Sequence, residues 1–269
     1  MTGMLSFFGL IGRKTHLFFA EIARLQEIIQ SFLYWTLVAP VAGRRGLQRE
    51  AFSRQLAFTG SDSFPIIALV TASIGAVLTL QAAYQLKQFG ALIYTGGLVS
   101  VSMTRELGPV VTAIVIAGRV GASITAELGT MKVQEEVDAL TTMGIPPVAY
   151  LVVPRILAIA IALPCLTMLG NVIGMFGGYV VGTFGLGINS SLYIQESFDA
   201  LVQKDVLTGL VKSAVFSLLV GFIAVHEGFS VQGGAEGVGQ ATTRSVVLSI
   251  ITIIVADCLL TAIFYYLFP

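Results

Sequence analysis

The sequence predicts an all-α membrane protein, and three observations lead to this fold class. Of the 269 residues, 55% are hydrophobic and only 11% are charged, whereas soluble domains are about 25% charged. Five apolar stretches are long enough to cross a bilayer as a helix, which takes about 20 residues. The alternation of apolar and polar residues that is typical of membrane strands is absent. Fifteen basic and fifteen acidic residues balance, so we expect no nucleic-acid partner.

Residues 1–63 are predicted to form an interfacial amphipathic helix followed by a basic segment on the cytoplasmic side. Glu21, Arg24 and Glu27 lie on one helix face, and apolar residues lie on another, as in helices at the membrane surface. A cleaved signal peptide ending near Ala42 is the alternative, but the preceding region is too long and carries two glutamates. The apolar face consists of Phe18, Ile22, Leu25, Ile29 and Phe32.

Residues 64–269 are predicted to form the transmembrane domain. Charge interrupts its second span. The third span is too long for one upright helix, so it tilts, projects beyond the bilayer or breaks near Pro164. The five predicted spans cover residues of about 64–86, 97–128, 148–183, 206–225 and 245–268.

The basic residues predict a multi-pass topology with the N-terminus in the cytoplasm. Cytoplasmic segments of membrane proteins carry an excess of Lys and Arg, and seven of the fifteen basic residues precede the first span. Five spans then place the loops 129–147 and 227–243 inside, and the loop 185–205 and the C-terminus outside. The seven residues are Arg13, Lys14, Arg24, Arg44, Arg45, Arg49 and Arg54.

Several catalytic and nucleotide-binding motifs are absent from the sequence. There is no Gly-x-x-x-x-Gly-Lys-Ser/Thr loop to hold nucleotide phosphates and no Gly-x-Ser-x-Gly turn. His16 and His226 are the only histidines and lie far apart in the sequence, so we expect no histidine-based metal site. Cys165 and Cys258 both lie in apolar runs, which is not a disulfide framework. We therefore expect no enzyme, no catalytic residues and no cofactor in this chain, and any energised work must draw on a partner or an ion gradient.

Charged residues within the predicted spans are the main candidates for a functional site, because charge inside a bilayer is costly. Arg105 and Glu106 lie about eight residues into the second span, and Pro109 cannot donate a hydrogen bond to the carbonyl of Arg105. The two form either a polar site that faces a cavity and meets a charged headgroup, or a structural ion pair at the outer interface. Asp257, in the fifth span, also needs a partner, which the sequence does not identify.

Two further sets of polar residues have helical spacing. Arg119, Ser123 and Glu127 follow at intervals of four residues and so share one helix face, which favours a polar seam between helices. Asp205 and Lys212 are seven residues apart and also share a face of their helix.

Four glycines repeat every fourth residue in the third span. Such a ridge lets helices approach closely in lipid, so we expect it to be intolerant of bulk. It forms either a subunit or sliding interface, or tight packing within one subunit. The four are Gly170, Gly174, Gly178 and Gly182.

Residues 130–144 predict a short amphipathic helix in the first inside loop. Val133, Val137 and Leu140 form an apolar stripe at helical spacing, and Gly144 followed by two prolines ends the helix. The helix either docks in a groove of a cytoplasmic partner or lies on the bilayer surface. Three acidic residues off the stripe disfavour the anionic surface; they are Glu135, Glu136 and Asp138.

The most specific patterns resemble one known family. The segments RELGPVV (105–111), AGRVGA (117–122), AELGTM (126–131), DAL (138–140) and ATTR (241–244) are similar to those of the MlaE/YrbE-type permease of the Mla/MCE lipid-transport ABC systems. The resemblance runs from about residue 99 to the C-terminus. The first sixty residues are similar only in character.

This resemblance implies a permease that moves phospholipid between the membrane and its partners. It implies a homodimer, two copies of a separate ATPase subunit that bind the ATP and Mg, and an MCE-domain substrate-binding protein on the outer side. Phospholipid would occupy a pocket between the two permease subunits, lined by Arg105 and Glu106. Lys212, Arg244 and, less closely, Arg54 match basic positions near that pocket.

The resemblance also implies that residues 130–144 form the coupling helix that docks on the ATPase. Its contact residues would be Val133, Glu135, Glu136, Val137, Asp138 and Leu140. Glu136 stands where many relatives have Gln, which changes the charge of that contact. The expected location is a bacterial inner membrane, with a plastid inner envelope as the alternative. The alternative functions are a gradient-driven secondary transporter or channel, for which we see no inverted repeat, and a non-transporting scaffold.

Overall fold

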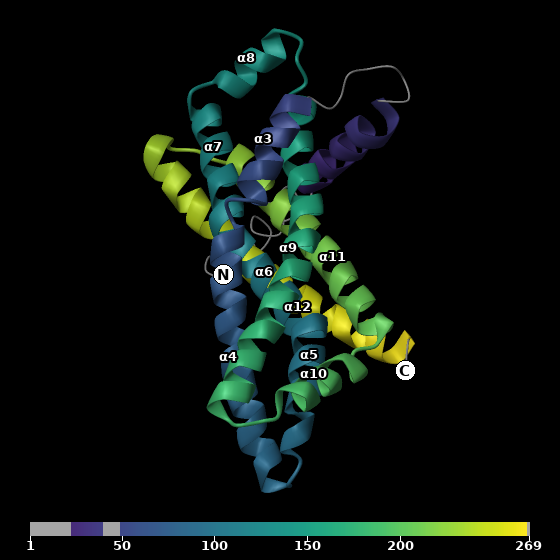
Figure 1. Cartoon of the computed structure of the whole chain (residues 1–269). Coiled ribbons are helices and arrows are strands. Elements are labelled where there is room, and N and C mark those ends of the chain that lie inside the picture. The colour runs from purple at the N-terminus through teal and green to yellow at the C-terminus, as the bar shows by residue number, and fades with distance from the viewer. Residues whose placement is uncertain (1–22, 40–48, 268–269) are drawn as a thin grey trace, which may run out of the picture.

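The structure, a computed structural model, describes residues 23–39 and 49–267, and most of these residues are helical, with no strands among them (Figure 1). Five helical stretches within the described residues are long and apolar enough to span a membrane. The predicted all-α membrane fold is therefore confirmed. The short helix α8 lies at one end of the bundle, and α10 lies at the other (Figure 1).

The helix over residues 23–39 packs against the bundle through one face. Phe32 is buried and meets the ring of Phe222 edge-on, with 5.4 Å between ring centroids. Arg24 and Glu27 are exposed, as expected for the polar face of this helix. The remaining residues invoked for this segment lie outside the described residues; they are Arg13, Lys14, Phe18, Glu21, Ile22, Ala42, Arg44 and Arg45.

A bend separates α3 (Arg49–Thr59) from the first spanning helix, α4 (Phe64–Gln88). Pro65 lies in the first turn of α4, where its missing N–H costs no hydrogen bond. Arg119 holds the bend from outside. Its Nη1 donates to the Phe58 carbonyl at 2.9 Å and to the Ser63 hydroxyl at 2.6 Å, and its guanidinium lies 4.8 Å from the Phe58 ring centroid.

The second span is one long helix that includes two π-helical turns. The first π-turn comes immediately before Pro109, whose missing N–H removes one α-helical hydrogen bond. There Gly108 N–H donates to the Met103 carbonyl. The consecutive segments are α5 (Thr95–Ser102), η3 (Met103–Leu107), α6 (Gly108–Ile116), η4 (Ala117–Gly121) and α7 (Ala122–Val133).

The helix expected over residues 130–144 is divided into two. α7 ends at Val133, and α8 covers Glu136–Thr142. Glu135 between them has a φ of 61°, in the left-handed region, which breaks the helix. Gly144 ends α8 with a φ of 74°, as its position before two prolines predicts.

The third span is not broken by its internal proline. α9 (Val153–Val180) continues through Pro164, and the π-helical turns η5 (Val148–Val152) and η6 (Val181–Gly185) extend it at both ends. A further helix, α10 (Ser190–Asp199), occupies the loop that the sequence left without structure. The side chain of Asn189 caps it by accepting from the backbone N–H of Ser191 at 2.9 Å.

The last two spans are α11 (Gln203–Phe229) and α12 (Gly234–Leu267). The glycine-rich loop expected over 227–243 is much shorter, because most of it belongs to these two helices. α12 packs against α11 and α7 but remains largely uncovered within this chain. Ile251, Val255 and Leu259, four residues apart, are each more than half exposed on one of its faces.

The four-residue glycine repeat of α9 contacts helices of the same chain. A Cβ placed on Gly174 would lie 2.2 Å from Met103 Cε, and one on Gly182 would lie 2.6 Å from the Tyr193 ring. Gly170 faces Thr71 of α4, and Gly178 faces Thr79 of α4 and Tyr193 of α10. The backbones of α4 and α9 are in close contact at Gly75, where a Cβ would lie 1.8 Å from the Gly174 carbonyl oxygen. These contacts correspond to tight packing within one subunit.

Candidate functional site

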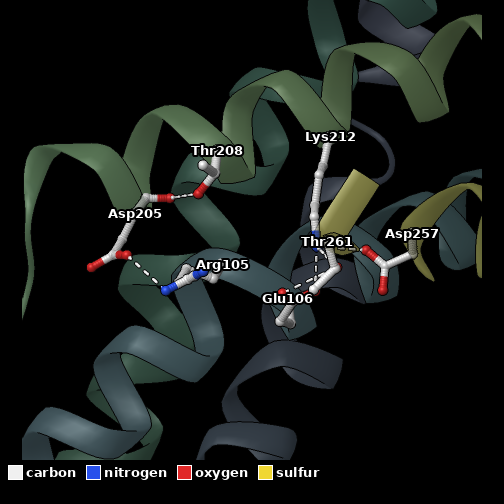
Figure 2. A network of polar contacts seen from close by, with 7 residues as sticks. All are labelled: Arg105, Glu106, Asp205, Thr208, Lys212, Asp257 and Thr261. Carbon is white, nitrogen blue, oxygen red and sulfur yellow. Dashed lines mark hydrogen bonds and ion pairs between the residues drawn. The ribbon is translucent and has the colours of Figure 1, made fainter. Parts of the chain in front are cut away.

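Charged side chains from the second, fourth and fifth spans meet inside the bundle (Figure 2). They form two groups, an ion pair between Arg105 and Asp205 and a triad in which Lys212 lies between Glu106 and Asp257. Each of these residues is within about ten residues of the helix end nearest α10, so both groups lie in that half of the bundle.

Lys212 is the centre of the triad, and its side chain is only 2% exposed. Its ammonium donates hydrogen bonds to Glu106 and to Thr261 Oγ1, the latter at 2.6 Å, and the Thr261 hydroxyl donates to Glu106 Oε2 at 3.2 Å. Asp257 Oδ1 lies 2.9 Å from Lys212 Nζ. A buried ammonium is costly unless charged partners surround it, and here two carboxylates do so.

Arg105 is in contact with a different residue of α11. Its Nη1 lies 3.6 Å from Asp205 Oδ1, a separation longer than a hydrogen bond. Asp205 is buried, and its other oxygen accepts from Val202 N–H at 3.1 Å. Asp205 and Lys212 lie on one face of α11, as their spacing predicts, so this helix supplies partners to both Arg105 and Glu106.

Close contacts with α9 and α11 hold the π-turn that carries Arg105 and Glu106. A Cβ on Gly108 would lie 1.7 Å from Asn171 Oδ1 of α9, and a Cβ on Gly209 of α11 would lie 2.2 Å from the Thr104 carbonyl oxygen. Only glycine, which has no Cβ, permits these approaches. The turn is therefore gripped between α9 and α11, which fixes where the two charged side chains begin.

The structure separates the other two basic residues implied by the family resemblance from this site. Arg54 is exposed, and its Nη2 lies 3.5 Å from Glu50 Oε1 on the same helix. Arg244 of α12 pairs with the buried Glu227 of α11. This pair lies toward the other end of the two helices, away from α10. There Arg24 and Arg244 line a polar cavity of about 370 Å³.

The polar seam expected along α7 links that helix to two others. Glu127 Oε2 pairs with Arg155 Nη2 of α9 at 2.9 Å and also accepts, through Oε1, from the Ser123 hydroxyl at 3.3 Å. Arg119, as described, reaches the bend between α3 and α4. In the residues that the structure describes, no group of three or more metal-ligating side chains occurs.

The apolar stripe of the expected coupling helix is turned largely inward. Val137 is buried and Leu140 is half-buried against the hydrophobic core, while Val133 is 40% exposed. Glu135, Glu136 and Asp138 are exposed, and Asp138 pairs with Lys132 at 3.1 Å. The most exposed large apolar side chain of this segment is Met143, with an exposed fraction of 72%. The exposed surface of this segment is thus mainly acidic, with Val133 and Met143 as its exposed large apolar side chains.

Sequence reasoning missed one member of the site and left another unpaired. Thr261 was not singled out, and Asp257 had no identified partner. The two are four residues apart, a spacing that places both on one helix face. A threonine one turn beyond an intramembrane aspartate was the available signal.

Comparison with known proteins gives consistent matches. A family model described as "Permease MlaE" matches residues 52–263. A "Probable ABC transporter permease protein" of Rickettsia bellii is 42% identical over 245 residues, which are 91% of this chain and 89% of that protein. The "Intermembrane phospholipid transport system permease protein MlaE" of Haemophilus influenzae is 38% identical, over 79% of this chain and 82% of that one. The chloroplastic protein TRIGALACTOSYLDIACYLGLYCEROL 1 of Arabidopsis thaliana is 35% identical, over 79% and 61%.

Proposed function

The chain belongs to the MlaE permease family of ABC transporters, and from this premise we propose that it moves phospholipid between the inner membrane and an MCE-domain protein on the outer side. Its role as an ABC permease subunit follows from the family. Phospholipid as the substrate is supported by the name of the Haemophilus influenzae relative, an intermembrane phospholipid transport system permease, and by the chemistry of the charged site. The alternatives, a gradient-driven carrier and a scaffold, have no such support.

The observation that carries the choice of substrate is the state of Arg105. It is a partly exposed cation within a membrane span, and its N–H groups make no hydrogen bond among the described residues. Its side chain is 36% exposed, and its one ion pair, with Asp205, is 3.6 Å long. A guanidinium offers five N–H donors in a planar arrangement that suits a phosphate group. An anionic phosphodiester is the ligand that would use these donors at a membrane depth where water is scarce.

The chain also has features that suit the partners we propose. The exposed apolar face of α12 that contains Ile251, Val255 and Leu259 would pack against a second copy, with lipid held between the two copies. The acidic surface of α8 with Met143 would contact the ATPase, two copies of which would bind the ATP and Mg. The expected location remains the inner membrane with a cytoplasmic N-terminus. The chloroplastic relative supports the plastid envelope as the alternative.

The test is lipid retention by the tagged, full-length chain, co-expressed with its ATPase and MCE partners and purified in mild detergent. Native mass spectrometry would report subunit stoichiometry and bound lipid together. Arg105→Ala should reduce bound phospholipid while leaving the dimer intact. Because this change leaves the buried Asp205 without its cation, which is destabilising, the double variant Arg105→Ala/Asp205→Asn is tested beside it.

Lys87→Ala is the matched control, because Lys87 is an exposed cation near the same end of the bundle and belongs to neither ion group. It should leave lipid occupancy unchanged. Equal phospholipid occupancy in the wild type and in both Arg105 variants would refute the headgroup role. A chain that is purified without ATPase or lipid would favour a gradient-driven carrier or a scaffold.

A further inference from the structure

The Lys212 triad contains two carboxylates and one ammonium, so its formal charge is −1. Glu106 and Asp257 are both carboxylates, and Lys212 is the one cation that contacts them among the described residues. Arg105 does not neutralise the excess, because it is paired with Asp205. An uncompensated charge in a low-dielectric interior is costly, and a further cation bound at the triad would offset this cost.

Asp257 is the member of the triad with unused hydrogen-bonding capacity. Its Oδ1 is 2.9 Å from Lys212 Nζ, yet this buried oxygen accepts no hydrogen bond. The Lys212 ammonium donates its hydrogen bonds to Glu106 and Thr261, and Figure 2 also draws its ion pair with Asp257. Oδ1 itself is buried, but the Asp257 side chain as a whole is 22% exposed, so a ligand can reach the carboxylate from its open side. A carboxylate has about four acceptor positions, and here no described residue donates to them.

The free acceptors of Asp257 and the free donors of Arg105 belong to adjoining groups. Arg105 directly precedes Glu106, and consecutive Cα atoms are about 3.8 Å apart. Glu106 and Asp257 share the same lysine. The site therefore presents a cation with free N–H donors and a carboxylate with free lone pairs in the same half of the bundle. Their partners, Asp205 and Lys212, are seven residues apart on α11, about 10 Å along the helix axis. A headgroup that carries both a phosphate and an ammonium can bridge these two groups, because it matches them in charge and in hydrogen bonding.

We propose that Asp257 is a specificity-determining residue that selects phospholipids with an ammonium in the headgroup over anionic phospholipids without one. This inference rests on the proposed function. The ammonium of ethanolamine supplies both the missing positive charge and N–H donors. Choline supplies the charge without N–H donors, and glycerol supplies neither. The order of preference is therefore ethanolamine, then choline, then glycerol.

The experiment uses the full-length chain in its purified complex. The complex is exchanged into detergent that contains equal amounts of phosphatidylethanolamine, phosphatidylcholine and phosphatidylglycerol with identical acyl chains, and native mass spectrometry measures the bound lipids. We expect the ethanolamine lipid to be enriched about tenfold over the glycerol lipid, a ratio that corresponds to about 1.4 kcal/mol. This measurement on the wild type needs no variant to fold.

Asp257→Asn then assigns the preference to one residue. The amide keeps the size of the side chain but leaves the triad neutral, so the ethanolamine-to-glycerol ratio should approach one through increased binding of the anionic lipid. Asp199→Asn is the matched control, because Asp199 is exposed at the end of α10 and should keep the wild-type ratio.

The outcomes separate this inference from the proposed function. Retained lipid with no headgroup preference, or a preference that Asp257→Asn leaves unchanged, would overturn the role of Asp257 while leaving phospholipid transport in place. Absence of all three lipids from the wild-type complex would overturn the proposed function itself.

Discussion

The close contact between α4 and α9 at Gly75 gives a quantitative prediction. A Cβ at Gly75 would lie 1.8 Å from the Gly174 carbonyl oxygen, whereas carbon–oxygen contacts between packed helices are about 3.3 Å or longer. Gly75→Ala must therefore push α4 and α9 apart by about 1.5 Å at this point. The atom that is struck belongs to the backbone, so no side-chain rotation can relieve the contact.

The expected cost is that of overpacking, about 1–3 kcal/mol. Alanine also favours helix over glycine by about 1 kcal/mol, which would conceal part of the cost in a single variant. Gly118→Ala removes this ambiguity, because a Cβ on Gly118 would meet no atom within 4 Å. Both variants replace a helical glycine by alanine, so their difference in stability reports chiefly the contact between α4 and α9.

The assay is thermal unfolding of the purified chain in mild detergent, followed as the fraction that remains monodisperse in size-exclusion chromatography after heating. At about 2–4 °C per kcal/mol for a chain of this size class, Gly75→Ala should unfold several degrees below Gly118→Ala. Equal unfolding temperatures for the two variants would show that α4 and α9 are not in backbone contact, and the reasoning would be refuted.

Two further predictions concern the other end of the bundle. Arg119→Met removes the hydrogen bonds to the Phe58 carbonyl and the Ser63 hydroxyl, and amide hydrogen exchange across residues 58–63 should become faster, whereas unchanged exchange would mean that Arg119 does not hold the bend. Met143→Asp should reduce the amount of co-purified ATPase without lowering the chain's own unfolding temperature. Leu140→Asp, in contrast, should lower that temperature because Leu140 packs against the core. Full retention of the ATPase by Met143→Asp would exclude this surface as the docking site.

The spans were predictable from sequence because the requirement for about 20 apolar residues is local. The helix α10 was missed because its amphipathic sequence contains no long apolar run, and its cap at Asn189 is a short signal. The interruption at Glu135 was also missed, since a non-glycine residue in the left-handed region is uncommon. The prediction for Gly144 succeeded because glycine before two prolines has few alternatives.

For the candidate site too, features set within one helix could be predicted from sequence, and contacts between helices could not. The shared face of Asp205 and Lys212 was predictable, because once a segment is helical, spacing alone decides which side chains share a face. Which helix lies opposite that face is set by packing among the five spans, which residue spacing does not encode. The pairing of Lys212 with Asp257 and the separation of Arg244 from the site are therefore results of the structure.

The two π-helical turns have a consequence for the register of the second span. Arg105 and Arg119 are fourteen residues apart, almost four α-helical turns, so a regular helix would present both on nearly the same side. Instead Arg105 contacts α11, and Arg119 contacts the bend before α4. Each π-turn absorbs one additional residue, which rotates every later side chain by about 100° relative to a regular helix. The span therefore behaves as three separately phased segments, and gain or loss of a single residue within a π-turn redirects an entire segment rather than one side chain.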